Sequence, residues 1–301
     1  MRDGCQGAVL TRAMRTVQIE GSALSASRLG LGTASLHHLV SARARGDLLA
    51  QAWEQGIRYF DTAPLYGHEL AERELGRFMR GRRSNTVLAT KAGLLPGAWR
   101  SRWPPLMYLE KGVRGIVQRA SGLRLNSGTP RSDYSAAYVR RRVERSLRVL
   151  RTDYIDILYL HEPTLIHIEQ PLELTEALLQ LQRAGKIRAF GLSAGFEACA
   201  AIARAHPRLA GIVQLQVQPT LRDTRGAGVG GRPAQVTFGH LRESKLTGLE
   251  RALARACELN ESGVILFSTR SARHLREVAA ALAAIERGAQ AGAASIAAVR
   301  L

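Results

Sequence analysis

Eight short, almost wholly apolar runs are the feature that most constrains the fold of this 301-residue chain. They are SRLGLGTAS, IRYFDTA, TVLATKAG, YIDILYLHE, IRAFGLSAG, GIVQLQVQP, AQVTFG and GVILFSTR. Strands of a parallel sheet are buried on both faces, so they form continuous apolar segments rather than alternating ones. Helical patterns separate most of the runs, and no linker is apparent near the middle of the chain. The pattern predicts an α/β fold in which a single domain forms a (β/α)8 TIM barrel.

Seven helical patterns lie between these runs, one fewer than an ideal barrel has. The first, GDLLAQAWEQG, places Leu48, Leu49, Ala52 and Trp53 on one face and is predicted to end at Gly56. The others are expected over residues 69–79, 138–150, 172–182, 198–205, 247–259 and 271–285. The missing helix would fall in LRDTRGAGVGGRP. Each glycine there disfavours a helix by about 1 kcal/mol, so we expect a flexible loop.

The remaining segments set the expected boundaries. Residues 1–15 are expected to be a disordered leader, with Met14 as a candidate true start, and residues 16–286 to form the barrel. The segment TVQIEGSALSASR predicts a hairpin that caps the barrel, and residues 287–301 are expected to be a mobile tail. An insertion over 95–133 follows the third strand. Long loops are usually functional or disordered, so a lid over the active-site mouth, a partner surface and a disordered loop all stay open.

Charge and composition limit the classes of binding partner that this chain is expected to have. The net charge of +18 would suit nucleic acid. However, only four of the 43 basic residues are lysines, and the arginines are scattered over solvated helix faces such as YVRRRVERSLRVLR. We therefore expect no nucleic-acid partner, although the charge favours anionic ligands in general. No apolar stretch is long enough to span a membrane. Three widely spaced cysteines indicate neither disulfides nor a metal site, and fit a reducing cytoplasm.

Four polar side chains follow three of the predicted strands: Asp61, Tyr66, Lys91 and His161. The carboxyl ends of barrel strands are where barrel enzymes hold their catalytic groups. Hydride transfer to a carbonyl builds negative charge on oxygen, so a proton donor must stand beside it. We predict that Tyr66 is this donor, that Lys91 lowers the pKa of its phenol, and that Asp61 holds Lys91 in place. His161 would hydrogen-bond the substrate oxygen and orient it.

Each of the four also has an ordinary structural interpretation. Asp61 would cap a turn, Tyr66 would pack on the barrel rim, Lys91 would extend from a strand end to solvent, and His161 would be a core residue. A lysine at a strand end also suits a barrel enzyme that forms Schiff bases. Tyr66 and Asp61 would then need other roles.

The segments FDTAPLYGHE, VLATKAG, LRTDYIDILYLHEP and LQRAGKIRAFGLSAG together resemble the aldo-keto reductase superfamily. The resemblance extends from about residue 29 to residue 282. It implies a (β/α)8 barrel that binds NADPH, or sometimes NADH, without a Rossmann fold, in keeping with the lack of a GxGxxG directly after any predicted strand. It also implies catalysis by Asp61, Tyr66, Lys91 and His161 on a small-molecule carbonyl or alcohol substrate.

The resemblance further implies a set of cofactor contacts. Ser193 and Gln214 would hold the nicotinamide carboxamide, and FSTRSARHLRE would hold a 2′-phosphate, so NADP(H) is expected, with NAD(H) as the alternative. The full set is Thr33, Asp61, Ser193, Gln214, Ser268, Thr269, Arg270 and His274. The chain departs from the family pattern at Ala194, Gln218, Val278 and the segment FGHL, which leaves weaker or altered cofactor binding open.

The sequence therefore predicts a cytoplasmic NADP-dependent aldo/keto reductase, a monomer or small homo-oligomer, that reduces an aldehyde, ketone or sugar carbonyl. The alternative is a regulatory or interaction subunit on the same barrel, with little or no turnover. The altered cofactor segments and the insertion favour this alternative, and the pair Tyr66 and Lys91 disfavours it.

Overall fold

The computed structural model describes residues 14–95, 131–217, 229 and 234–299. The leader 1–15, the insertion 95–133 and the glycine-rich loop after the sixth predicted strand lie almost wholly outside these residues. Gln218 lies outside them as well.

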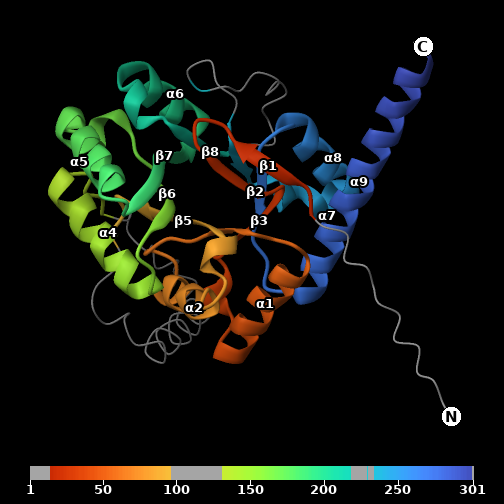
Figure 1. The fold of residues 1–301 in the computed structure, drawn as a ribbon, viewed down its shortest axis with the longest axis horizontal. Helices are drawn as coiled ribbons and strands as arrows, with labels where there is room; N and C mark the ends of the chain where they lie inside the picture. Colours follow the sequence, from red (N-terminus) through yellow and green to blue (C-terminus); the bar gives the residue numbers. More distant parts are fainter. Residues whose placement is uncertain (1–13, 96–130, 218–228, 230–233, 300–301) are drawn as a thin grey trace, which may run out of the picture.

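Eight parallel strands close into a barrel with helices around the outside (Figure 1). Their order around the barrel is β10-β3-β4-β5-β6-β7-β8-β9, which confirms the predicted fold and all eight predicted strands. The strands are β3 (Leu29–Gly32), β4 (Tyr59–Asp61), β5 (Val87–Ala92), β6 (Ile155–His161), β7 (Ile187–Gly195), β8 (Ile212–Gln216), β9 (Val236–Phe238) and β10 (Val264–Phe267). The register pairs Lys91 with Tyr159 and His161 with Ser193, so the predicted site residues are brought to one end of the barrel.

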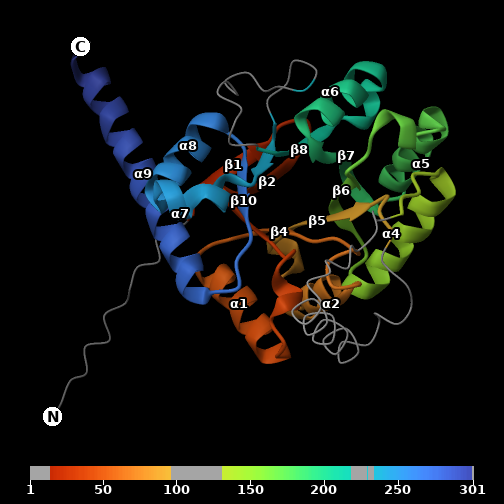
Figure 2. The same ribbon diagram turned by 180° about the vertical axis from the view of Figure 1, so that it is seen from behind.

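The helices surround the strands, as the view from behind also shows (Figure 2). They are α1 (Ala42–Glu54), α2 (Leu70–Phe78), α4 (Ala136–Leu150), α5 (Pro171–Arg183), α6 (Phe196–Ala205), α7 (Ser244–Thr247), α8 (Leu249–Leu259) and α9 (Ala272–Val299). Short 3₁₀ turns lie at Leu36–His38, Arg83–Asn85, Leu165–His167, Pro207–Leu209 and His240–Glu243. The seven predicted helices are all present, and α7 is additional. Helix α1 ends just before Gly56, whose φ of 81° suits glycine.

Helix α9 is longer than the sequence pattern indicated. The prediction ended it at residue 285 and gave residues 287–301 to a tail, whereas the helix continues to Val299. Its last turns project beyond the barrel in both views (Figures 1 and 2). The segment AGAASIAAV is rich in alanine, and this propensity offsets the cost of its glycine. None of the described helices, α9 included, is both long and apolar enough to cross a membrane.

An antiparallel hairpin of β1 (Thr16–Ile19) and β2 (Leu24–Ser27) closes the end of the barrel opposite the predicted site. Four of its apolar side chains, Val17, Ile19, Leu24 and Ala26, are buried in one cluster with residues of the barrel interior. The predicted capping hairpin is therefore present. Inside the barrel, the hydroxyls of Tyr59 and Tyr159 lie 3.2 Å apart, so the interior is packed rather than open.

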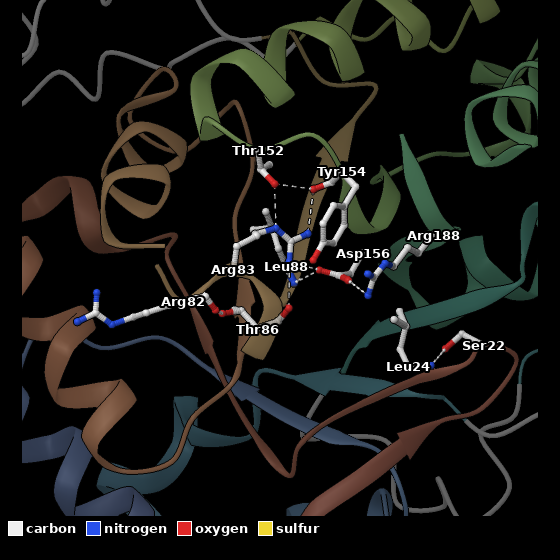
Figure 3. Close-up of polar contacts among 10 residues, drawn as sticks. All are labelled: Ser22, Leu24, Arg82, Arg83, Thr86, Leu88, Thr152, Tyr154, Asp156 and Arg188. Atoms are coloured by element: carbon white, nitrogen blue, oxygen red, sulfur yellow. Dashed lines mark hydrogen bonds and ion pairs between the residues drawn. The ribbon is translucent and has the colours of Figure 1, made fainter. Parts of the chain in front are cut away.

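A buried carboxylate joins three strands close to this hairpin (Figure 3). Asp156, near the start of β6, accepts hydrogen bonds from the backbone N–H of Leu88 at 2.9 Å and from Arg188 at 3.0 Å. It also pairs with Arg83 at 2.7 Å. Both guanidinium groups lie over the ring of Tyr154, 3.8 and 4.2 Å from its centre. The buried charge is thus fully paired, and it fixes β5, β6 and β7 at their amino ends.

Candidate active site

A cavity of about 510 Å³ opens at the carboxyl ends of the strands. Among the residues that line it are eight of those predicted from the sequence: Asp61, Tyr66, Lys91, His161, Ser193, Gln214, Ser268 and His274. The four candidate catalytic side chains therefore share one cavity with four of the candidate cofactor contacts. Each of the four catalytic candidates is placed by the end of a strand or by the loop that follows it, whereas His274 lies in the first turn of α9.

A chain of hydrogen bonds crosses the floor of the cavity. The ammonium of Lys91 donates to Asp61 Oδ1 at 2.5 Å and to the carbonyl of Thr62 at 3.1 Å. Gln214 Nε2 donates to Asp61 Oδ2 at 2.9 Å, and Ser193 Oγ donates to Gln214 Oε1 at 2.5 Å. Asp61 and Lys91 are both almost completely buried. Burial alone would lower the pKa of Lys91, but the adjacent Asp61 carboxylate keeps it above its usual value, so Lys91 is charged.

Tyr66 lies beside this chain. The Lys91 ammonium is 5.1 Å from the centre of the Tyr66 ring, and the His161 ring is perpendicular to it at 5.9 Å. Burial raises the pKa of the Tyr66 phenol above 10.0, and the charge of Lys91 opposes that rise without cancelling it. The sequence predicted a lowered pKa because it could not show how deeply the phenol is buried. The phenol is therefore protonated at neutral pH and poised to donate.

His161 is held neutral at the same end. Burial, with the charge of Lys91 as a second cause, lowers the pKa of its imidazole well below 6.5. The hydroxyl of Tyr134 donates to the His161 carbonyl at 2.5 Å. Gly93 makes room for this contact, because a Cβ at its position would lie 2.1 Å from the Tyr134 ring, and its φ is 116°.

The loop that carries Tyr66 is fixed from outside the barrel. Glu69 adopts a left-handed backbone, with φ of 71°, and its carboxylate is buried. Arg145 binds both of its oxygens, at 2.6 and 2.8 Å, and Arg142 donates at 2.7 Å. Next to it, Glu72 accepts from the hydroxyl of Thr90, which precedes Lys91. Helix α4 thereby supports both the tyrosine loop and the lysine strand.

Three of the predicted cofactor contacts, Thr33, Thr269 and Arg270, are not among the described residues that line the cavity. Thr33 donates from its N–H and its hydroxyl to the carbonyl of Asp61, at 2.8 and 3.0 Å, and so fixes that backbone. Thr269 Oγ1 accepts from the N–H of Ser271 at 3.1 Å, just before α9. Arg270 is exposed and makes no ion pair or hydrogen bond with the described residues.

Several lining residues were not anticipated from the sequence. Glu162, Gln216 and Phe238 line the cavity, and Phe238 ends β9 in the segment FGHL. Their positions after or at strand ends were the available signal, but strand ends alone do not show which side chains point inward. Val278, which departs from the family pattern of cofactor contacts, lies on α9 and is wholly buried in the apolar core. No group of three or more His, Cys, Asp or Glu side chains in the described ranges could hold a metal ion.

Tyr66, Lys91, Asp61 and His161 gather around a cavity at the carboxyl ends of the strands of a closed (β/α)8 barrel, which is where barrel enzymes hold their catalytic groups. The sequence identifies the family to which this barrel belongs. The model of the aldo/keto reductase family matches residues 28–225, and this chain belongs to that family.

The matches to curated relatives cover part of this chain and part of each relative. This chain is 34% identical over 181 residues to an uncharacterized oxidoreductase, YqkF, of Bacillus subtilis. The matched region covers 60% of this chain and 49% of the relative. This chain is also 34% identical over 187 residues to pyridoxal 4-dehydrogenase of Microbacterium luteolum, which covers 56% and 52%. The chain thus spans about half the length of these curated relatives.

Solved structures share the fold over nearly the whole chain. A putative aldo-keto reductase from Pseudomonas aeruginosa superposes with a TM-score of 0.69 at 24% identity, covering 92% of this chain and 99% of that one. An aldo-keto reductase from Bacillus halodurans, in its holo form, gives a TM-score of 0.65 at 23% identity, covering 89% and 91%. These structures agree with the barrel described above.

Proposed function

We propose that this chain is an NAD(P)H-dependent oxidoreductase that reduces an aldehyde, ketone or sugar carbonyl, with Tyr66 as the general acid. The observation that carries the proposal is the convergence of Tyr66 with Lys91, Asp61 and His161 on one cavity. Family membership supports it.

Three side chains have separate roles in the transfer of the proton. The Tyr66 hydroxyl donates its proton to the carbonyl oxygen as negative charge develops there. Lys91, held by Asp61 at 2.5 Å, stabilises the phenolate that remains. His161 is neutral, so its imidazole N–H donates a hydrogen bond to the same oxygen without competing for the proton. Lys91 and His161 are buried and Tyr66 is partly buried, which strengthens these interactions.

The chemistry of the lining fits a nicotinamide dinucleotide. Ser193 and Gln214 place a hydroxyl and an amide beside Asp61, and Ser268 and His274 line the same cavity near the start of α9. The amino end of a helix suits a phosphate, and beside it Arg270 has no ion-pair partner among the residues that the structure describes. When bound, the reduced dinucleotide supplies the hydride.

Titration with NADPH and NADH, followed by nucleotide fluorescence, tests the cofactor proposal directly. Turnover is then measured with a panel of aldehydes, ketones and sugars. Binding together with turnover supports the proposed reductase. Binding without turnover on any carbonyl favours the regulatory or interaction subunit, and absence of binding contradicts both the cofactor and the reaction.

We predict that carbonyl reduction is independent of pH from 6.5 to about pH 9. The reduction needs Tyr66 protonated, and its pKa lies above 10.0, so activity is lost only as the pH rises through that value. His161 has a pKa well below 6.5 and remains neutral over the whole interval. The measurement is kcat/KM against pH. An inflection near 6.5 would show that His161 is solvated and titrates normally.

Replacing Arg270 by alanine is expected to weaken NADPH about tenfold or more while changing NADH much less. Arg270 has no partner among the described residues, so its guanidinium is available to a 2′-phosphate. The matched control is Arg276→Ala, because that guanidinium donates to Gln51 at 2.8 Å. Equal losses for the two nucleotides, or equal affinities in the wild type, would contradict the assignment.

A further inference from the structure

Glu162 places a carboxylate at the cavity directly after His161. It lines the cavity together with Tyr66 and His161, and its side chain is exposed to solvent. A charged group at this point is available to a molecule that enters the cavity. The proposed reaction itself does not use it.

The backbone fixes the position of this carboxylate. Glu162 has φ of 51°, in the left-handed region, which a residue with a side chain rarely adopts. Its N–H donates to the carbonyl of Ser193 at 2.8 Å, which ties it to β7. Ser193 in turn belongs to the hydrogen-bonded chain on the cavity floor. The root of the Glu162 side chain is therefore held relative to the reacting groups.

Within the part of the chain that the structure describes, the charge of Glu162 has no local counterpart. The other lining carboxylate, Asp61, is bonded to Lys91 and Gln214. Among the described residues, the Glu162 carboxylate makes no ion pair or hydrogen bond. The lining cation Lys91 is already paired with Asp61, and His274 lies 3.6 Å from Glu277.

The carboxylate also acts on its surroundings. Burial is the main cause of the raised pKa of the phenols of Tyr66 and Tyr134, and the negative charge of Glu162 adds to it. Glu162 is thus close enough to the reacting phenol for its charge to be felt there. A substrate whose carbonyl meets Tyr66 would place neighbouring atoms within the same field.

We propose that Glu162 selects the substrate: it favours neutral carbonyl compounds that carry hydroxyl groups beside the carbonyl, and it disfavours carboxylated ones. The carboxylate accepts a hydrogen bond from a substrate hydroxyl and repels a substrate anion. This inference rests on the proposed reductase function. It is opposed by the basic insertion over 95–133, whose seven basic and two acidic residues favour an anionic substrate.

Three aldehydes and two variants test the inference. Glyceraldehyde and propanal have the same carbon chain and differ by two hydroxyls, and succinic semialdehyde carries a carboxylate. Glu162→Gln removes the charge, and Glu162→Met removes charge and acceptor at similar length. Glu169→Gln is the matched control, since Glu169 is an exposed glutamate of the same loop outside the cavity lining. Each result is the ratio of variant to wild-type kcat/KM for one aldehyde, so differences in aldehyde hydration cancel.

Glu162→Met is expected to lower kcat/KM for glyceraldehyde about tenfold and to leave propanal within about twofold. Both variants should raise kcat/KM for succinic semialdehyde several-fold, because the like charge is gone, and Glu169→Gln should change none of the three. Unchanged ratios for glyceraldehyde and succinic semialdehyde, or a wild-type preference for succinic semialdehyde, would overturn the inference alone. Absence of turnover with all three aldehydes would overturn this inference, and it would overturn the proposed function as well if no aldehyde, ketone or sugar of the wider panel were reduced.

Discussion

Tyr66→Phe is expected to lower the rate of carbonyl reduction by about 10² to 10⁴-fold while leaving nucleotide affinity nearly unchanged. The phenylalanine ring keeps the packing against His161, at 5.9 Å between ring centres, and the position over Lys91. Only the proton donor is lost. The measurement is kcat and KM for an aldehyde, with NADPH affinity determined separately by fluorescence.

The control for this variant is another phenol nearby. Tyr138→Phe removes a hydroxyl that donates weakly to the carbonyl of Leu94, at 3.5 Å, and that is outside the cavity lining. It should leave turnover within about twofold, because no interaction with the reacting oxygen is removed. Turnover of Tyr66→Phe within tenfold of the wild type would show that a different group supplies the proton.

Asp156→Ala is expected to destabilise the fold by about 3 kcal/mol or more. The substitution leaves the largely buried guanidinium of Arg83 without its counterion and the N–H of Leu88 without its acceptor. The loss of stability comes mainly from the guanidinium of Arg83 and the N–H of Leu88. Arg188 contributes less, because it is half-exposed and can be rehydrated. The measurement is the midpoint of chemical denaturation. Enzyme that remains folded should keep its KM, because the cluster lies at the end of the barrel opposite the cavity.

Two comparisons make this stability prediction specific. Asp156→Asn keeps an acceptor for Leu88 and should cost less, about 1 to 2 kcal/mol. Glu176→Ala removes one partner of an exposed pair with Arg183 and should not move the midpoint measurably. A midpoint for Asp156→Ala equal to that of Glu176→Ala would mean that the buried cluster contributes nothing to stability.

The barrel could be predicted from the sequence because its signal is local. Each buried strand is a continuous apolar run, and Gly56 marks the end of α1 through a backbone angle that suits glycine. The extent of α9 was missed because its last turns mix glycine with alanine and carry no end signal. Helix α7 was missed because four residues are too short for a periodic pattern.

The candidate site was predictable only in part, for a different physical reason. Strand ends identified Asp61, Lys91 and His161, because parallel strands bring their carboxyl ends together. The inward position of Glu162 depends on a left-handed backbone after β6, which no side-chain pattern indicates. The raised pKa of Tyr66 depends on the burial of its phenol, and the role of Thr33 depends on a hydrogen bond to a residue 28 positions away. Such tertiary relations are absent from local sequence.

The hydrogen bonds from Ser193 through Gln214 to Asp61 link these three side chains to one another. A carboxamide that binds to Ser193 or Gln214 must therefore exchange existing hydrogen bonds for new ones, and such an exchange has a small net free energy. For the proposed cofactor, these two side chains would set which face of the ring meets the carbonyl rather than how tightly the nucleotide is held. The floor of the cavity would then control the stereochemistry of transfer, and the affinity would come from the distant half of the dinucleotide.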